Sequence, residues 1–366
     1  MKKVIVGMSG GVDSSVAAIL LLKQGYNVEG LFMRNWDSNI NNDVLGNPDF
    51  TNDICPQEQD YNDAKKVCDK LGIKLHRVDF IKEYWDYVFT YFLDELKKGR
   101  TPNPDIMCNK FIKFDQFKKK AEELGADYIA TGHYARVDNG VLKRGLDSNK
   151  DQTYFLSQLS KKQLENVLFP VGELIKEDVR KIATEHDLVT AEKKDSTGIC
   201  FIGERNFKNF LKNYLPNKEG NIVNIETNEV LGTHIGLMYY TIGQRRGLYV
   251  GGTKSRLFVV GKDLSSNILY VSTNEEYLVS TSAKVGELNW LNDVKLEEVT
   301  AKFRYRQNDN NVKLEFLNDK EVLVKYDQGV KSVTPGQACV FYKGDICLGG
   351  GIIDEVFKNN QKIKYL

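Results

Sequence analysis

Residues 1–15 read MKKVIVGMSGGVDSS, and this stretch decides the fold of the N-terminal half of the chain. Val4 to Met8 is a mostly apolar run that is too short for a helix and is bounded by glycine, so it predicts a buried strand. The next apolar segment predicts a helix from Ser15 to Gln24, which Ser14 or Ser15 would cap. A glycine-rich loop between a strand and a helix N-terminus offers backbone N–H groups and the positive end of a dipole, which together favour phosphate binding.

Three interpretations of this loop compete. Gly7 to Gly11 matches the G-x-S-x-G pattern of serine hydrolases, with Ser9 as the nucleophile, but that pattern normally follows several strands and gives Asp13 no purpose. A turn that needs glycine only for its backbone angles is the plainest alternative. The third interpretation is a phosphate cradle, although neither the Walker pattern nor the dinucleotide-binding pattern is present. The sequence from Ser9 to Ser14, Ser-Gly-Gly-Val-Asp-Ser, resembles the loop of ATP pyrophosphatases, which split ATP into AMP and pyrophosphate, and this favours the third interpretation.

The composition is that of an ordinary globular protein of 366 residues, with 41% hydrophobic residues, and the length suffices for two or three domains. No apolar stretch has the length of a membrane span, and the run after Met1 is too short for a secretory signal, so we expect a cytoplasmic protein. A net charge of +1 gives no indication of a nucleic-acid partner. The 6 cysteines form no C-x-x-C pair, which argues against a structural zinc site and leaves reduced thiols as the expectation in the cytosol.

Up to about residue 135, apolar strands alternate with amphipathic helices, which is the pattern of a parallel sheet covered on both faces. Ligands of such sheets bind beyond the carboxyl ends of the strands. This rule places the first loop, Met33 and the turn at Gly132 and His133 near one another. Met33 is either a core residue or part of an adenine pocket. His133 is either a structural or a functional histidine. The expected strands are Val4–Met8, Asn27–Met33, Lys74–Asp79 and Tyr128–Gly132, and the expected helices are Ser15–Gln24, Gln57–Leu71, Ile81–Lys97 and Phe111–Leu124.

Two later loops each carry a cysteine. In the first, GRTPNPDIMCNK at 99–110, two prolines stiffen a turn that delivers Cys108 to the start of a helix, where the dipole and Lys110 should favour its thiolate. Asp105 in the same loop is able to exchange a proton with a reacting group. The second loop is DSTGICFIG at 195–203, in which Cys200 lies among small polar residues. A lone loop cysteine is more often structural, but two that the fold brings together would suit persulfide or disulfide chemistry.

With these segments in place, the chain resembles the bacterial tRNA-specific 2-thiouridylases over essentially its whole length. The resemblance implies an α/β fold with an N-terminal parallel-sheet domain of the adenine-nucleotide hydrolase type in 1–205, a small central domain in 206–250 and a C-terminal antiparallel β-barrel in 251–366. The short alternating segments from Val250 onward favour the barrel independently. The segments that match the family, in its order, are Ser9–Ser14, Asn103–Lys110, Gly132–Tyr134, Lys150–Gln152, Asp195–Gly203, Thr241–Arg245 and Arg304–Arg306.

The resemblance also implies the reaction, which is 2-thiolation of the wobble uridine in the anticodon loop of tRNA. ATP would adenylate the C2 oxygen with release of pyrophosphate, and a persulfide on Cys200 would then deliver sulfur while AMP departs. Cys108 corresponds to the nucleophile of the family, Asp105 is the candidate acid or base, and the two cysteines can end as a disulfide. The implied partners are tRNA and an upstream persulfide sulfur-relay protein, and we expect a monomer that needs no membrane.

The residues implied for binding form two groups. ATP would be held by the first loop, with Met33 and Gly132 toward the adenine and with Mg²⁺ near Asp13 to offset phosphate charge. The target base would be turned out of its loop to reach the nucleotide. The implied ATP-binding residues are Gly7, Met8, Ser9, Gly10, Gly11, Val12, Asp13, Ser14, Met33 and Gly132, and the implied tRNA-binding residues are Asn103, Pro104, Asp105, His133, Lys150, Asp151, Gln152, Tyr305, Arg306 and Gln337.

Alternatives remain at each level. From the residues alone, Lys150–Gln152 is interpreted better as a solvated turn, and the alternation at Arg304–Arg306 suits either an ordinary exposed strand face or contacts with phosphate and a base. A different ATP pyrophosphatase, one that transfers nitrogen to a carboxylate or carbonyl, would share the first loop but have no use for both Cys108 and Cys200. A regulatory nucleotide-binding module without chemistry would release no pyrophosphate.

Overall fold

The structure is a computed structural model, and it describes residues 1–365 except for 48–55, 196–197, 204, 249, 251–255 and 293–295. The chain divides into two compact units, each of which is described here by itself. The first unit contains Met1–Thr90, Pro104–Asn206 and Gly344–Leu348, and the second contains Tyr91–Asn103, Phe207–Lys343 and Gly349–Leu366. No helix of the described residues has the length and apolar character needed to cross a membrane.

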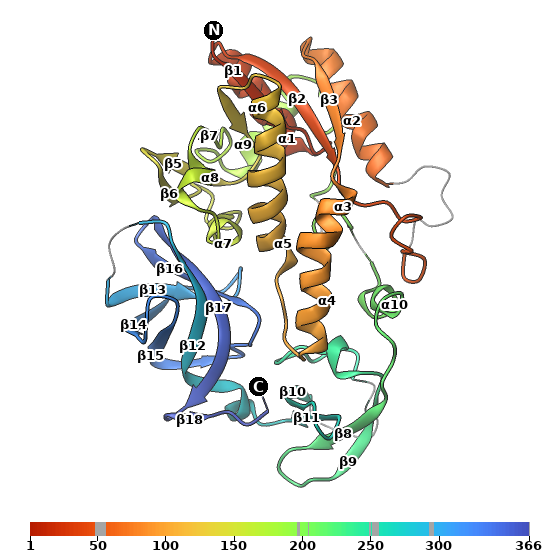
Figure 1. Cartoon of the computed structure of the whole chain (residues 1–366), viewed down its shortest axis with the longest axis vertical. Helices are drawn as coiled ribbons and strands as arrows, with labels where there is room; N and C mark the ends of the chain where they lie inside the picture. The colour runs from red at the N-terminus through yellow and green to blue at the C-terminus, as the bar shows by residue number, and fades with distance from the viewer. Residues whose placement is uncertain are drawn as a thin grey trace. The chain divides into compact units, whose positions relative to one another are not determined.

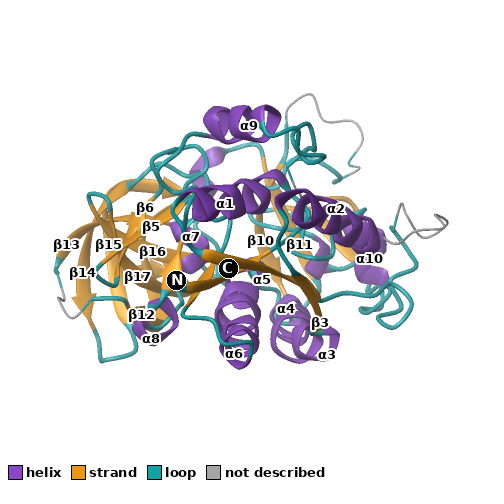
Figure 2. Cartoon of the chain, turned by 90° about the horizontal axis from the view of Figure 1, so that it is seen from above, coloured by secondary structure: helices purple, strands orange, loops and turns teal. Residues whose placement is uncertain are grey.

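The first unit is built on a parallel sheet with the strand order β3-β2-β1-β4-β7, which confirms the predicted sheet and adds a short fifth strand that was not expected. The central strand is buried on both faces because helices cover both, with α1 and α2 on one side and α3 and α6 on the other (Figure 2). The strands are β1 (Lys3–Gly7), β2 (Asn27–Arg34), β3 (Leu75–Asp79), β4 (Tyr128–Ala130) and β7 (Val167–Leu168), and the helices are α1 (Val12–Lys23), α2 (Pro56–Leu71), α3 (Ile81–Tyr84), α6 (Phe117–Glu123) and α9 (Lys176–Glu185).

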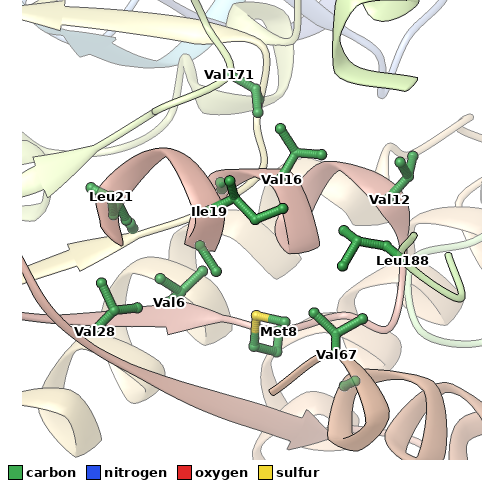
Figure 3. Close-up of a cluster of buried hydrophobic side chains, with 14 of the residues drawn as sticks. Val6, Met8, Val12, Val16, Ile19, Leu21, Val28, Val67, Val171 and Leu188 are labelled. Atoms are coloured by element: carbon green, nitrogen blue, oxygen red, sulfur yellow. The ribbon is translucent and has the colours of Figure 1, made fainter. Parts of the chain in front are cut away.

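The core of this unit lies around α1, which is apolar almost all round. Its side chains pack on the sheet through Val6 of β1 and through Met8, which directly follows this strand, and they also pack against Leu188 (Figure 3) and against α9. Val16 is fully buried, and burying a side chain of this size contributes about 1.5–3 kcal/mol. The helix is thereby fixed on two sides, so the loop that precedes it has a firm base.

The start of α1 differs from the prediction. The helix begins at Val12, its N-cap is Gly11, and no side chain caps it. Ser14 and Ser15 lie inside the first turn, and their hydroxyls donate back to the carbonyl of Gly11 at 3.1 and 2.9 Å. The expected serine cap is therefore wrong, because the glycine turn brings the chain into the helix earlier. The consequence is a helix N-terminus whose first N–H groups face no capping side chain.

The second difference concerns the segment with Cys108, which was expected to precede a helix. The helix starts four residues before Cys108, at Pro104. The first residue of a helix has no intrahelical partner for its N–H, so the missing N–H of proline costs no hydrogen bond there. It runs as α5 (Pro104–Met107), a π-helical stretch from Cys108 to Gln116, and then α6, and these form one continuous column in Figure 1. Cys108 thus lies within a helix. The other predicted helix, Ile81–Lys97, has the expected extent but also contains a π-helical turn, Trp85–Phe89, before α4 (Thr90–Lys97).

The remaining elements of the first unit are short. The strands β5 (Ala135–Asp138) and β6 (Val141–Arg144) form a hairpin, and Lys143 pairs with Ile346 at the start of β17 (Ile346–Lys358). Two single-turn helices, α7 (Thr153–Leu156) and α8 (Lys161–Leu164), follow the hairpin. A capping box between Ser160 and Gln163 begins the second of them.

The second unit contains one antiparallel assembly and one smaller mixed sheet, in which β8 and β11 run parallel, in its described part. In the larger one, β12 pairs with both β15 and β17, which closes the strands β12-β15-β14-β13-β16-β17 into a barrel, as predicted for the C-terminal part. The segments at 256–260 and 268–272, expected among the barrel strands, contribute instead to β10 and β11, which form a sheet with two strands that were not predicted, in the order β10-β11-β8-β9. The elements are α10 (Phe207–Lys212), β8 (Gly220–Asn224), β9 (Val230–His234), β10 (Phe258–Asp263), β11 (Ile268–Ser272), β12 (Val279–Trp290), β13 (Glu298–Lys302), β14 (Asn310–Phe316), β15 (Val322–Lys331), β16 (Ala338–Lys343), β17 and β18 (Gln361–Lys362).

Candidate active site

The glycines of the loop after β1 allow it to pack closely against neighbouring elements. Gly10 has φ +73°, and a Cβ added to it would lie 2.2 Å from the carbonyl oxygen of Asp60 in α2. Only glycine fits this position, both for its backbone angle and for the space. Within the loop, the backbone N–H of Ser9 donates to Oγ of Ser14 at 3.2 Å, and the two hydroxyls lie 3.1 Å apart. The loop is therefore a fixed shape ahead of the uncapped end of α1.

The turn after β4 packs directly on this helix end. A Cβ added to Gly132 would lie 2.7 Å from the backbone nitrogen of Ser14, so a side chain is excluded there. On the other side of β1, a Cβ added to Gly7 would lie 3.8 Å from Cε of Met33, which is 7% exposed at the end of β2. The structure thus brings the first loop, Met33 and Gly132 together at the carboxyl edge of the sheet. Backbone N–H groups without a capping side chain, in a cradle too close for side chains, fit the phosphates of a nucleotide.

A charged network lies beside the helix end. Oδ1 of Asp13 accepts a hydrogen bond from the hydroxyl of Tyr134 at 2.7 Å and pairs with Nζ of Lys176, also at 2.7 Å. The same ammonium pairs with Oδ1 of Asp195 at 2.8 Å. Partial burial opposes ionisation of Asp195, but hydrogen bonds from Lys150 and Lys176 outweigh it and lower the pKa of Asp195 to about 2. Asp195 stays ionised and links these cations.

The protein offers little for the expected magnesium ion. Among the described residues, no three His, Cys, Asp or Glu side chains are grouped as a metal site would need, and Asp13 is already paired with Lys176. Magnesium near Asp13 stays a prediction.

Cys108 and Cys200 are neighbours in space. Their Sγ atoms lie 3.5 Å apart, which is a contact between two thiols, since a disulfide bond measures about 2.05 Å. Cys108 is fully buried, whereas Cys200 is partly accessible. Cys55 and the two residues Ser196 and Thr197 lie outside the described residues. Two thiols in contact, one of them on a partly exposed residue, suit a sulfur atom that arrives at one and is resolved by the other.

The Cys200 loop is anchored by three helices. The backbone N–H of Cys200 donates to Oδ1 of Asp105 at 3.0 Å, and its carbonyl accepts from the hydroxyl of Tyr84, a fully buried residue of α3, at 2.8 Å. The next carbonyl, that of Phe201, accepts from Nε2 of Gln57 at 2.6 Å. Phe201 has φ +65°, and the loop closes through a bridge between Ile199 and Gly203. Asp105, expected as an acid or base and as a contact to the target base, therefore also positions the sulfur loop.

The cation beside the thiols is Lys113. Burial opposes its charge, but the two cysteines and Asp105 raise the pKa of Lys113 above its ordinary value. The pKa of the Cys200 thiol is lowered by the hydrogen bond from Cys108 and by the charge of Lys113, which together outweigh the effect of burial. Burial raises the pKa of the Cys108 thiol. The predicted activation of Cys108 is wrong, since Cys108 lies inside a helix, the cation that acts on its thiol is Lys113 and not Lys110, and the pKa of the thiol is raised.

The spacing of Lys113 from Cys108 explains why it was missed. Five residues in an α-helix turn the chain by about 140° beyond a full turn, which would point the two side chains apart. The π-helical stretch joins residues five apart by hydrogen bonds and so brings Lys113 toward the face of Cys108. Tyr84 and Lys176 were also missed, and no local pattern marks them. Tyr134 was named only as the last residue of the Gly132–Tyr134 segment. Asp195 was quoted only as the first residue of a motif.

Burial changes two further candidates. Burial raises the pKa of Asp105, in spite of its hydrogen bond from Cys200 and the charge of Lys113, which makes the protonated form more accessible near neutral pH. His133 is 7% exposed, its Nδ1 lies 2.7 Å from Oγ1 of Thr131, and its ring packs against Phe114 and Phe169. Burial lowers the pKa of His133 well below its usual range, so the imidazole is neutral.

The predicted tRNA contacts of the first unit are partly engaged within the chain. Oδ1 of the buried Asp151 accepts a hydrogen bond from the backbone N–H of Gly145 at 3.1 Å. Oε1 of Gln152 accepts a hydrogen bond from the backbone N–H of Tyr134 at 3.0 Å. Nζ of Lys150 pairs with Asp195 at 2.6 Å. These side chains hold the fold around the charged network, and their role toward tRNA stays a prediction.

The predicted tRNA contacts of the second unit lie in turns. Nε2 of Gln337 donates to the carbonyl of Thr101 at 2.7 Å, so it lies beside the segment that leads to Asn103. Tyr305 and Arg306 follow the end of β13 at Lys302 and form a turn, so the expectation of a strand through Arg306 is wrong. Arg306 is exposed and Tyr305 partly so.

Comparisons with known proteins cover nearly the whole chain. Three family models match in order: "tRNA methyl transferase HUP domain" at 2–204, "tRNA methyl transferase PRC-barrel domain" at 208–273 and "Aminomethyltransferase beta-barrel domain" at 280–353. A protein of Mesoplasma florum named tRNA-specific 2-thiouridylase MnmA is 62% identical and matches over 97% of this chain and 99% of its own. A protein of Geobacillus thermodenitrificans with the same name is 56% identical over 100% of this chain and 98% of its own.

One solved structure has a weaker similarity. It is a 4-thiouridine synthetase in complex with RNA and ATP, which is 16% identical, covers 56% of this chain and 46% of its own, and has a TM-score of 0.35, too low to bear on function. The family models and the relatives differ in the chemical group that their names mention, methyl or sulfur. The relatives match the chain from end to end at high identity, and two cysteines in contact have an evident use in sulfur transfer.

Proposed function

Because the chain belongs to the family of tRNA-specific 2-thiouridylases, which are tRNA sulfurtransferases, we propose that it activates the wobble uridine of tRNA with ATP and replaces the C2 oxygen with sulfur. The single observation that carries this proposal is the 3.5 Å contact between Sγ of Cys108 and Sγ of Cys200 beside Asp105 and Lys113. A nitrogen-transferring enzyme has no use for such a pair.

The first step is activation of the base. The C2 oxygen of the uridine attacks the α-phosphorus of ATP, the bond from that phosphorus to pyrophosphate breaks, and the uridine carries AMP on its C2 oxygen. The cradle between Gly10, Gly132 and the uncapped start of α1 supports this step, because N–H groups there are able to hold the phosphates in place. A flat base must leave the anticodon stack to reach the nucleotide.

The second step brings sulfur to the enzyme. The Cys200 thiolate attacks the outer sulfur of a persulfide on a donor protein, and the donor leaves as a thiol, so that Cys200 carries the extra sulfur. The outer sulfur then attacks C2 of the activated uridine, and AMP departs with the former C2 oxygen. The lowered pKa and partial accessibility of Cys200 support its role as the acceptor.

The third step releases the product. The sulfur of Cys108 attacks Sγ of Cys200, the bond between Sγ and the transferred sulfur breaks, and 2-thiouridine leaves with that sulfur. The two cysteines end as a disulfide, which two electrons from a cellular dithiol, itself oxidised to a disulfide, return to the two thiols of the starting state. Sulfur atoms already 3.5 Å apart need little movement to form this bond. Asp105, bonded to the Cys200 backbone, would take up or return the proton that this exchange requires.

The test is formation of 2-thiouridine by the purified protein. Unmodified tRNA, ATP, magnesium and a persulfide donor are incubated with the enzyme, and the nucleosides are analysed by mass spectrometry while pyrophosphate release is followed in parallel. Cys108→Ser and Cys200→Ser should each abolish 2-thiouridine. Cys68→Ala is the matched control, since Cys68 is a buried cysteine of the α1 core cluster, away from the thiol pair, and it should still form 2-thiouridine.

Two outcomes would contradict the proposal. Normal 2-thiouridine formation by either serine variant would remove the assigned roles of the cysteines. Pyrophosphate release without any 2-thiouridine in the wild-type reaction would favour a nitrogen-transferring enzyme instead.

A further inference from the structure

The first loop has no cation of its own. No lysine or arginine occurs from Val4 to Lys23, except Lys23 itself at the far end of α1. Loops of the Walker type carry a lysine that reaches the outer phosphates, so a loop without one leaves that charge to be met from elsewhere. Nζ of Lys176, which is 163 positions away from Asp13 in the sequence, lies 2.7 Å from Oδ1 of Asp13 at the start of α1.

Lys176 is held so that its ammonium remains at this place. It is the first residue of α9, and its backbone N–H donates to Oδ2 of Asp147 at 3.0 Å. The helix α9 packs on α1 through Val179 and Ala183, both fully buried. The base of the side chain is thereby fixed relative to the phosphate cradle.

The ammonium is nearly enclosed, since the side chain of Lys176 is 12% exposed. It pairs with Oδ1 of Asp13 at 2.7 Å and with Oδ1 of Asp195 at 2.8 Å, and it lies 5.7 Å from the centre of the Tyr134 ring. An ammonium group has three N–H donors, and the two carboxylates account for two of them. Among the described residues, no acceptor is found for the third.

The surrounding charges explain how Lys176 serves a nucleotide. Asp13 would repel phosphates at the helix end if its charge were not offset, and Lys176 offsets it. Asp195 is shared with Lys150 at 2.6 Å and Arg180 at 2.9 Å, so it anchors Lys176 while other cations balance it. The ammonium is therefore able to add a phosphate oxygen to its partners without losing Asp195.

We propose that Lys176 is a further ATP-binding residue, whose ammonium contacts the β- or γ-phosphate of the nucleotide in the cradle before α1. It would hold the pyrophosphate that leaves when the base is adenylated, and so favour the cleavage of ATP. This inference rests on the proposed function of the first loop as the ATP site.

The test compares two nucleotides that differ only in the outer phosphates. Binding of ATP and of AMP to the full-length protein is measured by titration calorimetry without tRNA, for the wild type, Lys176→Met and Lys176→Arg. The methionine variant should bind ATP about 10- to 100-fold more weakly, as expected for a lost charge-assisted hydrogen bond, while its affinity for AMP changes by less than about twofold. Arginine, which keeps the charge, should recover part of the loss.

Lys181→Met is the matched control, because Lys181 lies on the same helix, is 74% exposed and pairs only loosely with Glu185 at 4.0 Å. It should bind both nucleotides as the wild type does. Unchanged ATP affinity in Lys176→Met, or an equal loss for ATP and AMP, would overturn the inference and leave Lys176 a purely structural residue. A wild-type protein that binds no ATP would instead overturn the proposed function of the loop.

Discussion

Cys108 and Cys200 place their Sγ atoms 3.5 Å apart although 92 positions separate them in the chain. The contact depends on a helix that contains Cys108 and on a loop whose backbone at Cys200 is bonded to Asp105 and Tyr84. Because both sides are fixed by hydrogen bonds, the chemistry of this pair depends on its surroundings, and these can be changed one group at a time.

Lys113→Met should raise the pKa of the Cys200 thiol, because the ammonium that favours its thiolate is gone. The rate of alkylation of Cys200 by iodoacetamide, followed by mass spectrometry of the peptide that contains it, should then reach its midpoint at a higher pH than in the wild type. Lys110→Met is the control, since Lys110 lies on the same helix but does not contribute to the pKa of Cys200, and its profile should match the wild type. An unshifted midpoint in Lys113→Met would show that this cation does not act on the thiol.

Asp105→Asn should separate positioning from proton transfer. The amide oxygen of asparagine still accepts the hydrogen bond from the Cys200 backbone, so the loop keeps its place, but the group no longer exchanges a proton. We expect formation of 2-thiouridine to fall by about 10²-fold or more, while the free energy of unfolding changes by less than about 1 kcal/mol. Asp105→Ala should lose both. Full activity in the asparagine variant would leave Asp105 a positioning residue only.

Gly10→Ala should damage the nucleotide site and the fold together. The added Cβ would lie 2.2 Å from the Asp60 carbonyl in addition to the unfavourable φ of +73°, and we expect a loss of at least about 3 kcal/mol in the free energy of unfolding, with ATP binding lost. Gly25→Ala is the matched control, because Gly25 has φ +83° and open space around it. It should cost only about 1 kcal/mol in urea unfolding. Equal losses would mean that the backbone angle, and not the close approach, decides.

Asp195→Asn should change how stability depends on pH. In the folded protein the pKa of Asp195 is lowered from 3.8 to about 2, so the ionised group stabilises the fold above pH 3.8, and this contribution is lost as the pH falls toward 2. The side chain is 34% exposed, and after allowance for solvent screening we expect about 1 kcal/mol. Urea unfolding of the wild type and the variant should differ at pH 6 and converge near pH 2. A difference that does not shrink in acid would point to a cause other than ionisation.

Much of the fold was predictable because it follows from local periodicity. The strand-loop-helix unit at Val4 to Lys23 and the alternation after it determine a parallel sheet, and the short alternating segments after residue 278 determine the barrel. The four-stranded assembly was not predictable in full. The strands at 258–263 and 268–272 could join either the barrel or other strands, and a local pattern contains no information about such long-range pairing.

The candidate site shows the same limit more sharply. Motifs identified Cys108, Cys200 and the phosphate loop, but the thiol pair needed the fold to bring it together. Lys113 was not considered, and its spacing from Cys108 gives no signal at the period of an α-helix, because the chain adopts the wider π-helical turn there. Lys176 carries no motif at all, and only the packing of α9 on α1 brings its ammonium to Asp13.

The helical column from Pro104 to Glu123 also sets a length. A Cβ on Gly7 at the end of β1 would lie 3.5 Å from the ring of Phe117, which is fully buried, and Cys108 begins the π-helical stretch that leads to Phe117 in the same column. The removal of one residue between them would rotate Cys108 away from Cys200 while Phe117 stays against the strand. Under the proposed mechanism, such a chain would still cleave ATP but would leave the activated uridine without sulfur, so the number of residues in this helix is as much a requirement of the coupled reaction as any side chain.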